Sequence, residues 1–102
     1  MIPDFACEFS APIWLYQGQG TWHFITLPVD VAEQIRHLIT GRRRGWGSLR
    51  VKATIGSTVW ATSIFPYKEL DSFILPIKAQ VRKAEKLSLG DTVLTRITLV
   101  ES

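Results

Sequence analysis

Phe24-Ile25-Thr26-Leu27-Pro28 and Phe73-Ile74-Leu75-Pro76 are two short apolar segments that each contain a Leu-Pro step at their end. Each is followed by a stretch of helical periodicity, a glycine turn and an alternating segment, Leu49–Ile55 in the first case and Val93–Leu99 in the second. Each half of the chain therefore reads as strand, Leu-Pro, helix, glycine turn and strand. This repetition predicts two halves related by a pseudo-twofold axis, which interleave into a closed barrel with a helix at each end.

The rest of the chain supplies further strands. Apolar residues recur at every second position in most of them, which is typical of a strand with one buried face. The predicted strands are Phe5–Tyr16, Thr21–Leu27, Leu49–Ile55, Thr58–Phe65, Phe73–Ile77 and Thr92–Val100. Gln17-Gly18-Gln19-Gly20 and Gly56-Ser57 join neighbouring strands as hairpins. We predict a mainly β, pseudo-symmetric, closed or double-split barrel of about six or seven strands, capped by two short helices.

Length and composition indicate a single domain. The chain has 102 residues, of which 46% are hydrophobic, so residues 1–102 suffice for one core. Cys7 is the only cysteine, which excludes an intrachain disulfide and a thiolate metal cluster. The first residues lack the pattern of a signal peptide, and no apolar run is long enough to cross a bilayer. We expect a cytoplasmic protein without a membrane partner.

The most regular helical pattern follows Pro28. Between about Val31 and Thr40, apolar residues recur at i, i+4, i+7 and i+8, as on one face of a helix. Asp30 stands three residues before Glu33, which is the spacing of a capping box. The sequence therefore predicts a helix from about Val31 to Thr40 with Asp30 as its N-terminal cap.

A second, weaker helix is predicted over residues 78–86, which carry four cations: Lys78, Arg82, Lys83 and Lys86. Three of these share one helix face and could extend a basic surface. We favour the simpler interpretation, in which they form an ordinary solvated helix face.

Several segments together resemble a known family. They are Gly20–Pro28, Gly41–Ser48, Thr62–Pro66, Val81-Arg82-Lys83 and Gly90–Val93. In combination they are similar to the family catalogued as domain of unknown function 1905, over nearly the whole chain. The resemblance implies a small double-split barrel, a fold shared with dimeric bacterial transition-state regulators and antitoxins. It implies no activity, because function lies in sites and not in folds.

The segment Gly41–Ser48 combines three consecutive arginines, three glycines and a tryptophan. It lies in a span without acidic residues, from Gln34 to Lys68, that holds seven cations. Guanidinium groups bind phosphates, glycines allow close backbone approach, and an indole stacks on a base. The candidate binding residues are Arg42, Arg43, Arg44, Trp46, Arg50 and Lys52. We predict a non-catalytic binding module for an anionic ligand, with nucleic acid as one candidate; the alternative is a solvated loop whose Trp46 folds back onto the core.

The strand Thr58–Phe65 is apolar on both faces, which motivates a second hypothesis. Trp60 and Ile64 lie opposite Val59, Ala61 and Phe65, so a helix, a loop or a partner should cover the second face. A protein-interaction or scaffold module is therefore the alternative function, and the sequence leaves the oligomeric state open. The sequence contains four tryptophans, which we expect to serve the core more than a ligand site.

An enzyme that uses His23 ranks behind both of these hypotheses. His23 and His37 are not at a metal-ligand spacing, and the sequence contains no nucleophile elbow, phosphate-binding loop or dinucleotide fingerprint. We therefore predict no metal, no cofactor and no assigned catalytic residue. The enzyme hypothesis requires a concave pocket that holds both His23 and a carboxylate.

Overall fold

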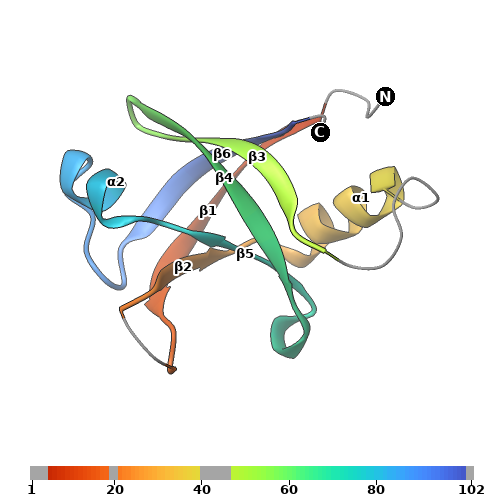
Figure 1. Cartoon of the computed structure of the whole chain (residues 1–102), viewed down its shortest axis with the longest axis horizontal. Coiled ribbons are helices and arrows are strands. Elements are labelled where there is room, and N and C mark those ends of the chain that lie inside the picture. The colour runs from red at the N-terminus through yellow and green to blue at the C-terminus, as the bar shows by residue number, and fades with distance from the viewer. Residues whose placement is uncertain (1–4, 19–20, 40–46, 101–102) are drawn as a thin grey trace.

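The computed structural model describes residues 5–18, 21–39 and 47–100, which form six strands and two α-helices (Figure 1). In chain order the elements are β1 (Ala6–Leu15), β2 (His23–Thr26), α1 (Val29–Ile39), β3 (Leu49–Ile55), β4 (Thr58–Tyr67), the 3-10 turn η1 (Lys68–Leu70), β5 (Ser72–Pro76), α2 (Ala79–Ala84) and β6 (Thr92–Leu99). The predicted order of strands and helices is confirmed.

The six strands close into one antiparallel barrel. Around the ring the order is β1, β2, β5, β4, β3 and β6, with β6 returning to β1. Both predicted hairpins are present, since β1 pairs with β2 and β3 pairs with β4. Figure 1 shows α1 and α2 at opposite sides of the barrel. The mainly β, closed-barrel fold with two short helices is therefore confirmed.

The strand order carries the predicted pseudo-twofold symmetry. Exchanging β1 with β4, β2 with β5 and β3 with β6 leaves the order around the ring unchanged. Two backbone hydrogen bonds repeat this relation at the β2–β5 contact. The Leu27 N–H donates to the Phe73 carbonyl at 2.9 Å, and the Ile77 N–H donates to the His23 carbonyl at 2.9 Å. These bonds place His23 and Phe73, and Leu27 and Ile77, at corresponding positions in the two halves, so the two Leu-Pro steps of the sequence repeat lie two residues out of register in the structure.

The barrel interior is filled by the inward residues of each strand and by one stripe from each helix. Phe9, Ala11 and Ile13 point inward from β1 and are buried, as the alternation predicts. The most deeply buried hydrophobic side chains are Phe73, Ile13, Ile25, Leu27, Ile35, Ile64, Leu75, Ile77, Ile97, Val51 and Val81. Each such burial stabilises the fold by about 1.5–3 kcal/mol relative to an exposed side chain.

The strand β4 is longer than predicted, because its proline is tolerated where the strand pairs with one neighbour only. Pro66 was expected to begin a loop, yet β4 continues to Tyr67. At this point β4 has left β3 and pairs only with β5, so a missing N–H leaves no gap in a second ladder. Pro12 lies where the pairing of β1 passes from β6 to β2. Each proline therefore lies where its strand is paired on one side only.

The predicted helix bounds also need correction. The helix α1 begins at Val29, and the Ala32 N–H donates to the Pro28 carbonyl at 3.0 Å. Asp30 is therefore inside the first turn and is not the cap, although its negative charge still favours that end of the helix. The helix α2 is shorter than predicted, and Lys86 lies beyond it with a positive φ of 56°.

Candidate functional site: an aromatic face with a basic border

The six residues proposed from the sequence divide into two groups. Arg42, Arg43, Arg44 and Trp46 lie outside the described residues. Arg50 and Lys52 lie on β3 and are exposed. Their inward neighbour Val51 is buried, so alternation places both cations on the outer face of the barrel.

Next to these cations, aromatic side chains cover the outside of the barrel. Trp14 on β1 packs against Phe24 on β2, with ring centroids 5.4 Å apart, and against Tyr67 on β4 at 5.7 Å. The Trp14 indole N–H donates to the Thr26 hydroxyl at 2.8 Å, which fixes the ring at a tilt of 39° to Phe24 and 42° to Tyr67. Trp22 stacks on Phe24 at 6.0 Å with an interplanar angle of 8°.

We call this surface the aromatic face, and it contains a hollow of about 350 Å³ lined by Tyr16, Trp22, Phe24, Phe65, Tyr67 and Ile74. Much of its ring area is open to solvent: Trp22 is 56% exposed and Phe65 is 42% exposed. Desolvation, with the nearby charge of Glu69, raises the pKa of the Tyr67 phenol. Trp60, by contrast, is buried in the core. Among the described residues, no other segment buries the rings of the aromatic face in this way.

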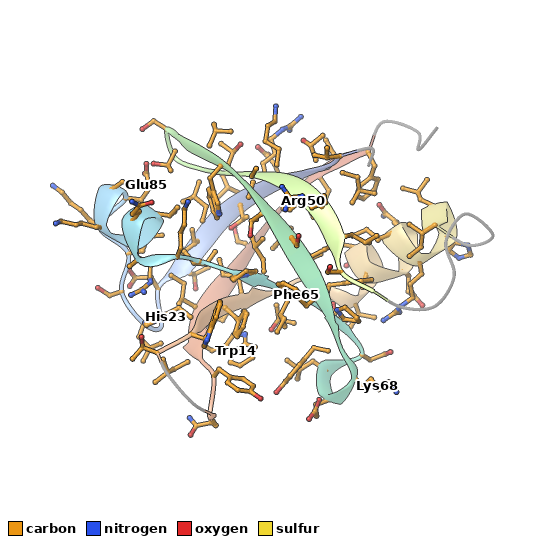
Figure 2. The ribbon with its side chains drawn as sticks, viewed as in Figure 1. Trp14, His23, Arg50, Phe65, Lys68 and Glu85 are labelled. Carbon is orange, nitrogen blue, oxygen red and sulfur yellow. The ribbon has the colours of Figure 1, made fainter. Side chains whose placement is uncertain are left out.

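A second hollow lies between the aromatic face and Arg50 on β3. It has a volume of about 360 Å³, and we call it the basic groove. It is lined by Trp22, Arg50, Trp60, Ala61, Thr62, Ser63, Phe65, Pro76 and Lys78. Arg50 faces Ser63 across the β3–β4 ladder, and Figure 2 shows Phe65 between Arg50 and Trp14. Two cations and three aromatic rings thus border one groove.

Carboxylates in the described part of the chain lie away from this groove. Glu8 pairs with Arg96 across β1 and β6 at 4.0 Å, and β6 is on the opposite side of the ring from β5. Glu85 accepts a hydrogen bond from the Thr58 hydroxyl at 2.5 Å, beside the β3–β4 turn. No acidic side chain of the described residues lines the groove or the aromatic hollow.

A third hollow lies at the end of the barrel that carries α2. It measures about 210 Å³, and we call it the end pocket. Its lining residues are Thr21, Trp22, His23, Pro76, Ile77, Lys78, Ala79 and Arg82. Arg82 Nε donates to the Ile77 carbonyl at 3.0 Å, and Arg82 Nη1 lies 3.5 Å from His23 Nε2. Trp22, Pro76 and Lys78 line both this pocket and the basic groove, so the two adjoin.

The match to known families agrees with this barrel. A family model for a domain of unknown function (DUF1905) matches residues 9–97, from within β1 to within β6. The chain belongs to the DUF1905 family. A comparison with curated proteins gives no match. The small pseudo-symmetric barrel implied by the resemblance is the fold of this DUF1905 domain.

The geometry around His23 bears on the enzyme hypothesis for this DUF1905 domain. His23 Nδ1 lies 2.8 Å from the Thr21 carbonyl oxygen, which can only accept, so Nδ1 carries the hydrogen. Within residues 5–18, 21–39 and 47–100, no carboxylate lines the end pocket, and no three His, Cys, Asp or Glu side chains group as metal ligands. His23 therefore lacks, among these residues, the acidic partner that the enzyme hypothesis required.

Two features of the DUF1905 site were missed at the level of sequence. Lys78 and Arg82 were interpreted as a solvated helix face, yet both line the end pocket. The tryptophans were expected to serve the core, yet Trp22 is 56% exposed and stacks on Phe24 at the outer face of the barrel. In the sequence, the feature that could have revealed this exposed face was the second apolar side of the strand Thr58–Phe65. Neither described helix has the length and hydropathy needed to cross a membrane.

Proposed function

We propose that this DUF1905 domain is a non-catalytic binding module for single-stranded nucleic acid, which lies across the aromatic face and the basic groove. The observation that carries the proposal is the position of Trp22. Its exposed ring lines the aromatic hollow, the basic groove and the end pocket. Stacking surface and positive charge therefore adjoin at one side chain.

The chemistry of a single strand matches both parts of this surface. Exposed bases stack on aromatic rings, and each stacked base contributes about 1–3 kcal/mol irrespective of its sequence. Arg50 and Lys78 stand beside the rings, where the phosphates of a stacked strand would pass. In a duplex the base faces are already stacked on each other, so they cannot use these rings.

The basic segment Gly41–Ser48 fits the same proposal. It leads directly into β3 in the sequence, and Arg50 is the second residue of that strand. We propose that Arg42, Arg43 and Arg44 add phosphate contacts and that Trp46 adds a further stacking ring. Lys52 extends the exposed basic row along the outer face of β3.

Fluorescence anisotropy of a labelled oligothymidine of roughly ten nucleotides tests the proposal. We expect binding at low salt, weaker binding at high salt, and little binding of the corresponding duplex. Trp22→Ala should weaken binding between about 5-fold and 150-fold, as the loss of one stacking ring predicts. Leu94→Ala is the matched control, since Leu94 is 59% exposed on the opposite strand β6.

Two results would count against nucleic-acid binding. The first is the absence of binding at low salt, together with an Arg42→Glu variant that behaves like the parent protein. The second is self-association in sedimentation velocity that Trp22→Ala abolishes while no oligonucleotide binds. That outcome would instead assign the aromatic face to a protein partner, the alternative suggested by the exposed rings.

A further inference from the structure

We propose that the end pocket binds the terminal phosphate monoester of the strand. This inference rests on the proposed function and adds an end-recognising subsite to it. The pocket is about 210 Å³, against about 350 and 360 Å³ for the neighbouring hollows. It is the small, charged compartment next to Trp22, where the last stacked base would place its phosphate.

Three nitrogen-bearing side chains converge on this pocket. Arg82 comes from α2, Lys78 precedes that helix, and His23 begins β2. The Arg82 guanidinium is fixed by its Nε bond to the Ile77 carbonyl at 3.0 Å. Its Nη1 contact with His23 Nε2 is long, at 3.5 Å, and leaves the remaining N–H groups of the fork available to an anion.

The other end of the barrel supplies an internal comparison. There Arg36 on α1 lies over Phe73, the position that corresponds to His23, with its guanidinium carbon 6.0 Å from the ring centroid. Its Nη2 donates to the Asp71 carbonyl at 2.8 Å and lies 3.4 Å from the Asp71 carboxylate. The same register places Thr21 where the other half has Asp71.

One end of the pseudo-symmetric barrel therefore neutralises its arginine with the chain's own carboxylate, and the other end does not. Among the described residues, no acidic side chain lines the pocket around Arg82. An arginine fork beside a second cation and no carboxylate is a receptive site for an anion.

The charge of the site favours a monoester over the phosphodiester of a continuous strand. A terminal phosphate carries a charge of about −1.5 to −2 and presents three acceptor oxygens. Arg82 and Lys78 together supply two positive charges and several N–H donors beside His23. A phosphodiester carries a single negative charge, so it would balance only one of the two positive charges of Arg82 and Lys78.

The test compares oligothymidines that carry a 5′-phosphate, a 3′-phosphate or only hydroxyl ends, by anisotropy at constant salt. We expect one of the phosphorylated ends to bind about tenfold more tightly than the hydroxyl form. Which end gains affinity gives the direction of the strand across the aromatic face.

Three variants locate the effect. Arg82→Gln should remove most of the gain, and Thr21→Asp should do the same by giving this end the carboxylate that Asp71 provides at the other. Thr21 is exposed, so the second variant keeps the inference testable if loss of the Arg82 bond to Ile77 weakens folding. Lys83→Gln removes one charge from an exposed residue of α2 outside the pocket and should keep the gain.

The outcomes separate the two proposals. Equal binding of all three oligonucleotides, with Trp22→Ala still weakening each, would overturn the end-pocket assignment and leave the proposed function standing. A phosphate preference that survives both Arg82→Gln and Thr21→Asp would also overturn it. If none of the oligonucleotides binds, the proposed function fails, and the subsite fails with it.

Discussion

The salt dependence of oligonucleotide binding should report the cations that border the aromatic face. Arg50, Lys52, Lys78 and Arg82 provide four possible phosphate contacts on described residues. For a single strand, each contact adds about −0.7 to the slope of log affinity against log salt, which gives about −2.8 for four. From these four contacts alone, raising potassium chloride from about 50 to about 200 mM should weaken binding about 50-fold, and the contacts proposed for Arg42, Arg43 and Arg44 would add to this loss.

Arg50→Gln should make that slope shallower, about −2.1, so the same increase in salt weakens binding only about 20-fold. The measurement is an anisotropy titration of labelled oligothymidine at five or more salt concentrations, with Lys83→Gln as the charge-matched control. A combined replacement of Arg42, Arg43 and Arg44 by glutamine shows whether the basic segment steepens the parent slope. A parent slope near zero, or equal changes from Arg50→Gln and Lys83→Gln, would refute the assignment of these cations.

Three further predictions concern the fold and its titration. Phe73→Ala, at a side chain 1% exposed, should lower the free energy of unfolding by about 3–5 kcal/mol in urea titrations, whereas Phe65→Ala on the outer face should cost less than about 1 kcal/mol. Gly56→Ala should cost about 1–2 kcal/mol, because Gly56 has a φ of 58° and an added Cβ would collide with the Glu85 carboxylate. Burial raises the pKa of the Cys7 thiol above its ordinary value. The folded state therefore disfavours the thiolate, so alkylation of Cys7 should be slow at neutral pH. The free energy of unfolding that Cys7 contributes should be lost as pH rises above the pKa of the unfolded thiol. The control is a Cys7→Ala protein, which should not show this loss at alkaline pH.

Strand alternation and the internal repeat were enough to predict the barrel. In β3, for example, Val51 and Ala53 are buried while Arg50 and Lys52 are exposed, because the period of two assigns them to opposite faces. Alternation does not say which face is inside when both are apolar. For β4 the sequence predicted two apolar sides, and only the closed ring shows that Phe65 lies outside.

The charged part of the candidate site depends on contacts that the sequence order conceals. His23 and Arg82 are 59 positions apart and meet because β2 and β5 pair at the centre of the pseudo-twofold. The helical spacing and charge of residues 78–86 predicted only that Arg82 lies on an ordinary solvated helix face. The repeat predicted that the two ends of the barrel are related. Only the observed strand register shows that Thr21 in one half and Asp71 in the other occupy corresponding positions.

The closure of the barrel also limits how any partner can be recognised. Each of the six described strands has a hydrogen-bonded neighbour on either side, although not along its full length. Only β1 and β4 are paired on a single side at each point along their length, so among the described strands an incoming peptide would extend the sheet most readily beside these two. Elsewhere on the barrel, binding specificity resides in side chains on the outer faces and at the ends of the strands, where a few substitutions can retarget the domain without disturbing its hydrogen-bonded frame.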